Sequence, residues 1–391
     1  MSTITLQNAD NALKTVYLDV VTEQLDQKAN PFLAAIEHST EDVWGKEVRK
    51  MVTFGVNGGF GAGTEDGKLP TATGNNYAQF VTTLKNLYGT IEISDKAIKA
   101  SQNNAGAFVN LINSEMEGLI KASKYNFGRM LFGSNEGYIS KLVEALDNQL
   151  VVEDTTGFVP GMVVELVSNG KVIEGSARRV VSIYTDIDTV NVDGPSLTDL
   201  NAPEGSLVCI QNSYNNELTG LESIFNLNIK SLYGVEKSSN PWLVPYIHHN
   251  IGDITEDIIQ FTIDEIERTS GSNINFIMCS WGVRRALQKL YSQNKIKLDT
   301  VELQGGYKTI SINGIPVVVD RFCPKGRMYF LNTNDFKLHQ LCDWQWLADD
   351  DGKVLKQVPG KPVYSATLVK YADLMCSRPC GQGMLADINE A

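Results

Sequence analysis

The chain is poor in the residues that mark several classes of protein, and each shortage excludes one of them. Only 6 cysteines and 12 prolines occur among its 391 residues, so neither a disulfide-dense secreted scaffold nor a proline-rich fibrous chain fits. No uninterrupted apolar run approaches the roughly 18 residues of a membrane-spanning helix. The first ten residues also lack a basic segment followed by an apolar run. We therefore expect no standard secretion signal, no membrane span, reduced thiols and synthesis in a cytoplasm.

Positive charge is scarce as well. The chain has 34 Lys and Arg against 46 Asp and Glu, a net charge of −12. Proteins that bind nucleic acid by neutralising many phosphates carry a basic excess, so a dedicated sequence-specific DNA binder is not expected. We expect the small basic clusters to be solvated faces or intersubunit ion pairs, with contact to DNA as the alternative. These clusters are Arg178-Arg179, Arg284-Arg285 with Lys289, and Arg321 with Lys325 and Arg327.

The spacings that phosphate or calcium sites need are absent. A phosphate-binding loop requires a glycine five residues before Gly-Lys-[Ser/Thr], but Gly67-Lys68 has Ala62 upstream and Leu69 after it. An EF-hand register ending on Gly352 would place Val358 where a bidentate acid belongs. The glycine-rich segment is therefore interpreted as a flexible loop and Asp349–Gly352 as an acidic turn.

Zinc and hydrolytic chemistry fit the sequence no better. His339 and Cys342 are three residues apart on an expected strand and so point to opposite faces. His248 and His249 lie in an expected loop with no acidic partner at catalytic spacing. The sequence predicts ordinary semi-buried thiols at Cys323, Cys342, Cys376 and Cys380, with no metal, no cofactor and no catalytic residue.

What the sequence does contain is a mixed set of helices and strands, enough for two or three folding units. The first forty residues favour helix, with Asn30 as an N-cap before Pro31. Residues 48–56 and 77–94 favour two long strands. Seven glycines between residues 55 and 74 separate them, so this hairpin needs neighbours to hold its tip.

Two further segments are well marked. Residues 103–132 keep the i, i+3, i+4 apolar rhythm of one helix of roughly 40 Å. Residues 151–211 contain five short strands divided by turns such as Asn169-Gly170, which predicts a small inserted β-barrel that folds autonomously. From Ile224 onward a helix with Ile254, Ile258, Phe261, Ile263 and Ile266, a buried strand at Phe276–Cys279 and a Ser280-capped helix indicate an α+β order.

This succession resembles the major capsid protein of tailed bacteriophages with the HK97-type fold, over nearly the whole chain. The glycine-tipped hairpin from Phe54 to Ile93 is similar to the family's E-loop, and residues 103–132 resemble its spine helix. Glu217-Leu-Thr-Gly-Leu221, Ile312–Asp320, Gly326–Asn332 and Tyr364–Tyr371 are similar in style to the segments of its main domains. The chain departs from the family in lacking a long scaffolding segment before the arm and in carrying the extra β unit. A separate scaffolding protein, or none, is therefore expected.

The resemblance implies a division of the chain into parts. These are an N-terminal arm (1–47), an E-loop (48–95), a peripheral domain (96–150 and 212–240) with an inserted β domain (151–211), an axial domain (241–360) and a return strand of the peripheral domain (361–391).

The resemblance also implies a function without chemistry, in which hexamers and pentamers of the chain close into an icosahedral shell around double-stranded DNA. The expected partners are other copies, a portal, a possible decoration protein and packaged DNA at non-specific proximity, in a virion assembled in the host bacterial cytoplasm. Phe54, Phe60, Tyr77, Phe80 and Tyr88 are expected to bury against neighbours, together with Lys68 of the loop. Some family members cross-link an E-loop lysine, but no partners for Lys68 can be assigned, which leaves it a solvated or ion-paired charge. The alternative is an encapsulin-like shell around cellular cargo.

Overall fold

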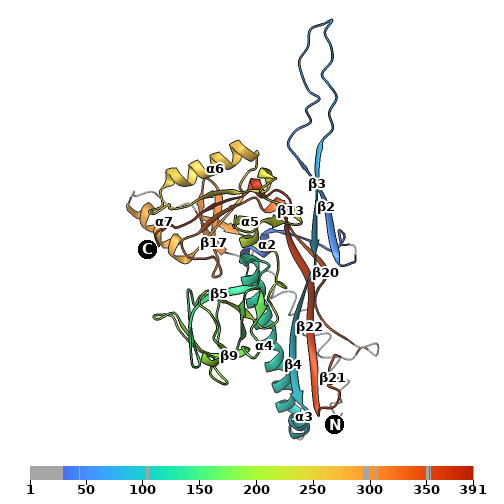
Figure 1. Cartoon of the computed structure of the whole chain (residues 1–391), viewed down its shortest axis with the longest axis vertical. Coiled ribbons are helices and arrows are strands. Elements are labelled where there is room, and N and C mark those ends of the chain that lie inside the picture. The colour runs from blue at the N-terminus through green and yellow to red at the C-terminus, as the bar shows by residue number, and fades with distance from the viewer. Residues whose placement is uncertain are drawn as a thin grey trace.

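The computed structural model of the protein describes residues 30–43, 45–102, 105–293, 300–303, 307–348, 352 and 354–390. The helix expected before Asn30 lies outside them, as do Asp349 to Asp351 of the expected acidic turn. A slender hairpin rises from one end of an elongated body, a long sheet and a long helix run along that body, and two lobes lie on one side (Figure 1). No helix among the described residues is long and apolar enough to cross a membrane.

A narrow sheet forms the backbone of the body. Its strands are β1 (Glu37–Ser39), β4 (Lys85–Ser94), β20 (Phe336–Trp346), β21 (Lys356–Gln357) and β22 (Val363–Cys376). The central strand β22 pairs antiparallel with β4 from Val363↔Ser94 to Ala372↔Lys85, and with β20 on its other side. The arm contributes β1, which adds to β20 in parallel.

Helices α3 (Asp95–Gln102) and α4 (Ala105–Phe132) follow β4 and pack against the sheet. The 28 residues of α4 confirm the predicted long helix. Its buried Met116, Ile120 and Phe127 belong to the same core as Ile91 of β4. The approach is close, because a Cβ on Gly89 would lie 2.7 Å from Leu119.

Helix α2 (Pro31–Ala35) begins where the sequence predicted, with Pro31 in its first turn and Phe32 and Leu33 buried in this core. Asn30 occupies the predicted N-cap position, although its side chain makes no capping hydrogen bond. Its amide is instead enclosed at 1% exposure.

The hairpin consists of β2 (Glu47–Phe54) and β3 (Asn76–Thr83), paired residue by residue from Glu47↔Thr83 to Phe54↔Asn76. The predicted single strand 77–94 is in fact two strands that break at Leu84. Strand β3 stays with β2, whereas β4 joins β22 in the long sheet. A continuous β pattern cannot reveal this break, because pairing partners are set by tertiary structure.

The lower lobe is a closed six-stranded barrel in the order β11-β5-β6-β10-β9-β7, with β7 pairing back to β11 and β8 added beside β7. The strands are β5 (Tyr138–Leu146), β6 (Gln149–Val152), β7 (Val163–Ser168), β8 (Lys171–Val172), β9 (Arg178–Tyr184), β10 (Thr189–Val192) and β11 (Leu207–Ile210), with the short helix η1 (Thr198–Leu200) before β11. The predicted boundary at residue 151 is wrong. The unit begins at Tyr138, because β5 closes the barrel between β6 and β11.

The upper lobe is a second seven-stranded sheet, which carries helices α6 (Glu256–Ser270) and α7 (Trp281–Gln293). Its strands are β14 (Tyr246–His248), β23 (Gly383–Leu385), β19 (Met328–Leu331), β15 (Phe276–Cys279), β18 (Ile315–Val319), β17 (Tyr307–Ile312) and β16 (Thr300–Leu303). The buried strand at Phe276–Cys279 and the Ser280 cap, which accepts from Val283 N at 3.3 Å, are confirmed. Phe261 was expected on the apolar face of α6 but is 55% exposed.

Two of the expected domain boundaries do not match the sheets to which the strands belong. Residues 361–391 were predicted to return to the long sheet as one strand, but only β22 does so, and β23 pairs with β14 and β19 in the upper lobe. Residues 241–360 were assigned to one domain, yet β20 lies in the long sheet. The remaining short elements are α5 (Leu221–Phe225), β12 (Ser231–Leu232), β13 (Val235–Glu236), η2 (Pro241–Leu243), η3 (Thr333–Asp335) and η4 (Pro379–Gly381).

Candidate assembly surfaces

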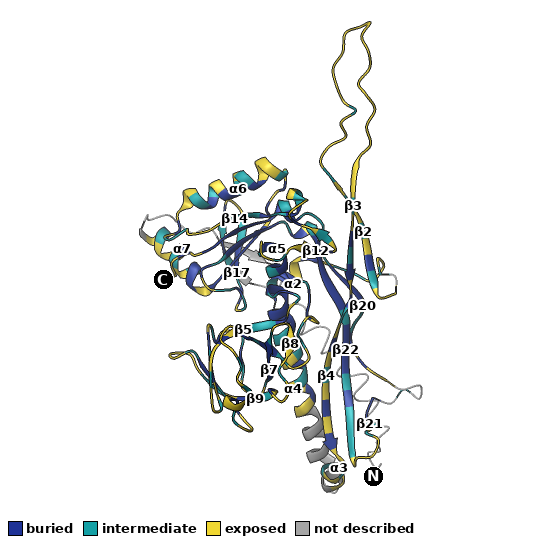
Figure 2. Cartoon of the chain, viewed as in Figure 1, coloured by how far each residue is buried: buried dark blue, intermediate teal, exposed yellow. Residues whose placement is uncertain are grey.

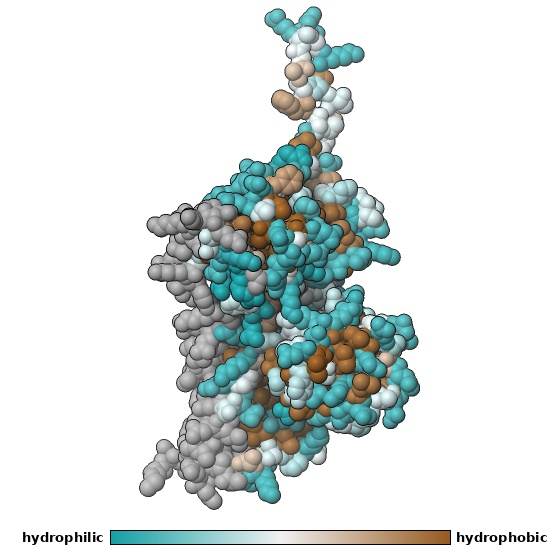
Figure 3. Space-filling model, turned by 90° about the vertical axis from the view of Figure 1, so that its left-hand side faces the viewer, coloured by the Kyte–Doolittle hydropathy of each residue, from teal (hydrophilic) through white to brown (hydrophobic). Residues whose placement is uncertain are grey.

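The projecting hairpin is the most exposed ordered feature of the described chain. Residues 55–75 form its tip, outside any strand, and extend well beyond the body (Figure 1). Val56, Phe60 and Leu69 are 85%, 94% and 89% exposed. The tip is exposed along nearly its whole length in Figure 2, and apolar side chains alternate with polar ones along it in Figure 3. Large apolar side chains held this far into solvent are typical of an interaction surface.

Asn57 organises the lower part of the tip. Its Oδ1 accepts hydrogen bonds from Gly59 N at 2.8 Å and from Thr73 Oγ1 at 3.3 Å. Its Nδ2 donates to Asn75 Oδ1 at 3.0 Å. These bonds join the two legs across 16 and 18 residues, so one side chain limits how far the legs can spread. No pattern in the sequence distinguishes Asn57 from the other polar residues of the tip.

Aromatic stacking anchors the base of the hairpin to the body. Trp242 of η2 stacks on Phe54 with ring centroids 4.6 Å apart, and on Phe80 at 5.8 Å. Phe80 is 0% exposed and also packs 5.2 Å from Tyr233. The prediction that Phe80 contacts a neighbouring subunit is therefore wrong, because its own chain encloses it. Phe54 is half-buried for the same reason.

A buried carboxylate joins three segments beside this base. Asp373 of β22 accepts from Thr82 Oγ1 of β3, from Thr219 N at 2.7 Å and from Thr219 Oγ1 at 3.0 Å. Burial raises the pKa of Asp373, and the hydrogen bonds oppose that rise. The hairpin therefore has a fixed base and a solvated tip.

The remaining residues of the expected contact set are accessible. Phe60 and Lys68 lie on the exposed tip, and Tyr77 of β3 is 56% exposed. Tyr88 lies on the outer face of β4, at 6.2 Å and edge-on to Tyr371. Their contact with neighbours remains a prediction.

The described residues give no support to the metal and catalytic sites that the sequence disfavoured. The described residues contain no group of three or more His, Cys, Asp or Glu that could hold a metal, and all six cysteines are free. Burial raises the pKa values of Cys209 and Cys279 to about 12, so neither is a reactive thiolate. His339 is 0% exposed, and burial lowers its pKa to about 4.

The two adjacent histidines differ from their expected placement. His248 ends strand β14 rather than lying in a loop. His249 Nδ1 lies 3.4 Å from Asp387 Oδ2, an acidic neighbour that spacing along the chain did not reveal. Both side chains of this pair are more than half exposed, which is typical of a weak surface pair.

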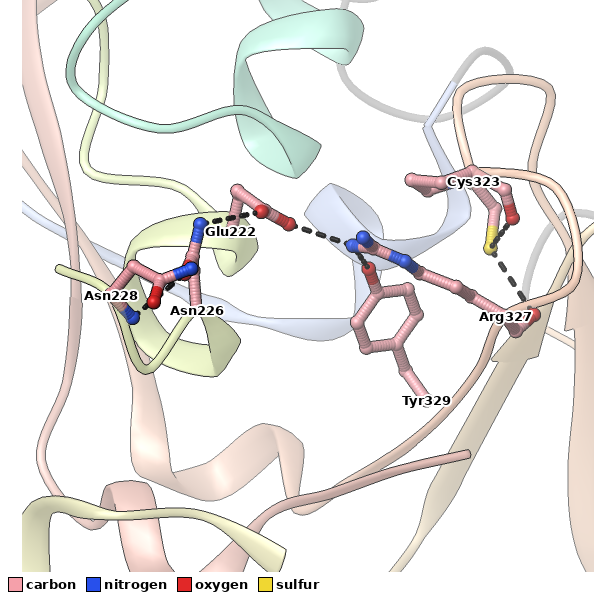
Figure 4. A network of polar contacts seen from close by, with 7 residues as sticks. Glu222, Asn226, Asn228, Cys323, Arg327 and Tyr329 are labelled. Atoms are coloured by element: carbon pink, nitrogen blue, oxygen red, sulfur yellow. Dashed lines mark hydrogen bonds and ion pairs between the residues drawn. The ribbon is translucent and has the colours of Figure 1, made fainter. Parts of the chain in front are cut away.

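Several of the basic residues expected to face solvent or other subunits have partners in their own chain. Arg327 Nη1 lies 2.7 Å from Glu222 Oε2 and 3.3 Å from the Tyr329 hydroxyl, in the network of Figure 4. Asn226 Nδ2 donates to the other oxygen of Glu222. For Arg327 the expectation is wrong, because the ion pair ties the residue before β19 to α5 within one subunit.

Other residues of the basic clusters also have partners in their own chain. Lys325 Nζ lies 3.2 Å from Asp154 of the barrel. The guanidinium groups of Arg284 and Arg321 lie over the rings of Trp281 and Tyr125, each 4.8 Å from the centroid. Arg178 donates to backbone carbonyls of its own barrel. Of these, Lys325–Asp154 and Arg321–Tyr125 join different parts of the chain, whereas the contacts of Arg284 and Arg178 stay within α7 and the barrel.

A buried lysine also has its partners within its own chain. Lys237 Nζ donates to the carbonyls of Ser223, Ile224 and Asn226 at 2.8 to 2.9 Å, which satisfies the C-terminal end of α5. Burial lowers the pKa of Lys237 to about 8. Chemistry that needs a free amine is not supported here, since all three donors have partners.

Similarity to known proteins appears at the level of structure alone. No protein-family model matches the chain, and no curated protein matches it. A chain of the cyanophage A-1(L) capsid asymmetric unit superposes with a TM-score of 0.58 at 12% identity, covering 92% of this chain and 93% of that one. The holo-SrpI encapsulin of Synechococcus elongatus PCC 7942 gives 0.48 at 11% identity, with 95% of each chain covered. The capsid of Myoviridae phage XM1 gives 0.47 at 10% identity, covering 90% and 89%.

The similarity to the cyanophage chain spans nearly all of both chains and shows that they share a fold. It confirms, for the overall architecture, the HK97-type capsid fold that the sequence predicted.

Proposed function

We propose that this chain is the major capsid protein of a tailed bacteriophage, and that copies of it form an icosahedral shell around double-stranded DNA. The observation that carries the proposal is the shared fold with a cyanophage capsid chain over 92% of this one. The exposed apolar side chains of the hairpin support it independently, because they need a cover that their own chain does not supply.

Within this proposal the parts take the family's roles with corrected boundaries. The hairpin β2–β3 is the E-loop, α4 with the long sheet is the peripheral domain, and the upper lobe with β23 is the axial domain. The barrel that begins at Tyr138 is an inserted domain displayed on the shell. No catalytic role is assigned to any residue.

In this proposal, burial of the hairpin tip against other copies stabilises the assembly. Fixing each residue of the tip costs about 1 to 2 kcal/mol of backbone entropy, so contacts outside the subunit must offset that cost. Phe60, Tyr77 and Tyr88 supply apolar area for those contacts, and Lys68 supplies a charge. Closed rings of five and six copies are the expected units. A separate scaffolding protein, a portal and a decoration protein are proposed partners of the shell in the host cytoplasm.

The test is the assembly state of the expressed chain. We expect sedimentation and negative-stain microscopy to show megadalton isometric particles, and particles from infected cells to hold nuclease-protected DNA. Monomers or small rings under all conditions would contradict the shell. Particles filled with one cellular protein would indicate an encapsulin-like compartment instead.

A further inference from the structure

A half-open groove separates α4 from the barrel. It encloses about 900 Å³ and is lined by one face of α4, by residues 159–163 of the barrel and by Arg321 and Phe322. The barrel and α4 lie beside each other along this length of the molecule in Figure 1. Leu119, Met162, Val163, Ile210 and Phe322 give the groove apolar walls.

The charge of the groove is opposite to that of the chain. Its lining includes Lys121, Lys124, Arg179 and Arg321 against the single acid Glu115, whereas the whole chain carries −12. In the part of the chain that the structure describes, Lys121, Lys124 and Arg179 take part in no ion pair. Four cations around an apolar floor favour an acidic occupant that also carries apolar side chains.

The floor also contains an unmet hydrogen-bond acceptor. Asn126 lines the groove, and its buried Oδ1 has no hydrogen-bond partner. A buried acceptor without a donor costs roughly 1 to 3 kcal/mol in general, so an occupant that brings an N–H group is favoured. A glycine-rich backbone can approach such an atom closely because it has no Cβ.

The tip of the hairpin combines acidic residues, apolar side chains and a glycine-rich backbone. Glu65 and Asp66 are exposed, Phe60 and Leu69 are about nine-tenths exposed on either side of them, and Gly63 and Gly67 frame the acids. The tip points away from the barrel and α4 of its own chain, at the opposite end of the molecule (Figure 1). A tip that enters this groove must therefore come from another copy of the chain.

We infer that the groove between α4 and the barrel receives the acidic tip of the hairpin from a second copy of this chain. Glu65 and Asp66 face the cations of the groove, and Phe60 and Leu69 cover its apolar walls. The inference rests on the proposed function, since it names the partner of the hairpin in the shell. It also gives the barrel a role, because the barrel forms one wall of the site.

Charge reversal with rescue tests this pairing. The tip variant E65K/D66K and the groove variant K121E/R179E should each lower the yield of particles roughly tenfold, since like charges then face each other. The combined variant should recover to within about twofold of the unaltered chain, because the charges are opposite again. The control D199K/E204K changes the charge by the same amount on an exposed part of the barrel outside the groove lining, and should assemble normally.

Carbodiimide cross-linking of particles of the unaltered chain locates the contact directly. Mass spectrometry should find Glu65 or Asp66 joined to Lys121 or Lys124 in a dimer of the chain. Acids of the tip joined only to other lysines, or to a different protein, would overturn the docking, as would a combined variant no better than its parents. The proposed function would survive those results. Absence of particles from the unaltered chain would overturn both.

Discussion

At the scale of single residues, close backbone approach decides which glycines the fold depends on. A Cβ on Gly220, the residue before α5, would lie 2.4 to 2.7 Å from the carbonyl oxygens of Met130, Leu131 and Gly133 at the end of α4. Backbone atoms cannot move aside as a side chain can. We expect Gly220→Ala to lower the free energy of unfolding of the subunit by about 1 to 3 kcal/mol, measured by urea denaturation of unassembled protein.

Gly118 provides the matched control. It lies inside α4, and an added Cβ meets nothing within 4 Å. Gly118→Ala should stabilise the subunit by about 0.5 to 1 kcal/mol, because alanine loses less entropy in a helix. Equal effects of the two substitutions would contradict the role of backbone contact at Gly220.

A buried acid gives the subunit a pH-dependent instability. Asp320 is 2% exposed, and burial raises its pKa from 3.8 to about 6. The folded state then holds a proton that the unfolded state has released, so stability from this group is full below pH 3.8 and is lost as pH rises through 6. Asp320→Asn should stabilise the subunit more at pH 7 than at pH 4, by up to about 3 kcal/mol. Denaturation at both pH values checks this, since Asn keeps the acceptor for Phe322 N.

His339 supplies the opposite sign as a control. Burial lowers its pKa from 6.5 to about 4, so the unfolded state binds the extra proton and stability falls as pH drops from 6.5 toward 4. The free energy of unfolding of a His339→Met variant should therefore rise relative to that of the unaltered chain as pH falls. For Asp320→Asn the same difference should rise as pH rises. The same trend in both variants would show that these two groups do not set the pH dependence.

At the scale of elements, the barrel is a unit with its own core. Eleven buried residues, among them Leu142, Leu150 and Val208, form a cluster separate from the other two cores. The ends of the unit are adjacent, since Tyr138 of β5 pairs with Cys209 of β11. Its surface is partly apolar, since Val181, Tyr184 and Ile187 are more than half exposed.

We expect a fragment of residues 138–211 to fold alone and give dispersed amide NMR signals. The fragment 151–211 should be disordered, because it lacks β5, which closes the barrel, and the buried Leu142 and Leu150. A folded 151–211 fragment would show that β5 is an addition to the barrel rather than part of it.

At the scale of the whole molecule, the hairpin tip adds nothing to the subunit's own core. Deleting Asn57 to Thr73 and closing the strands with a short turn leaves Phe54, Phe80 and Trp242 stacked at the base. We predict a soluble subunit with normal circular dichroism that forms no fast-sedimenting particles, because the contact between copies is lost.

The substitution F60S/L69S keeps the length of the hairpin and removes only its two most exposed apolar side chains. Like the deletion, it should lower the yield of particles. Because the hairpin keeps its length, such a loss would be due to the apolar side chains and not to the absence of the loop. Intact shells from the deletion variant would refute the role assigned to the tip.

Local signals in the sequence were sufficient for most elements. The apolar rhythm predicted α4 as observed from Ala105 to Phe132, and the Asn313-Gly314 and Asn169-Gly170 turns have the positive φ values expected of them. Their physical causes lie within a few residues, namely helical periodicity and the freedom of glycine and asparagine to adopt left-handed conformations. The order of these elements carried the resemblance that implied the HK97-type fold.

Pairing and burial between distant segments were decided only by the tertiary structure. The alternation of residues 77–94 is the same before and after Leu84, yet β3 pairs with residues 47–54 and β4 with residues 363–372. Phe80 and Tyr88 are both aromatic residues at alternating positions, but Trp242 and Tyr233 enclose only Phe80. The sequence determined which segments form helices and strands, because those preferences are local. The groove, the base of the hairpin and the closure of the barrel depend on contacts between residues far apart in the chain, which local preferences do not specify.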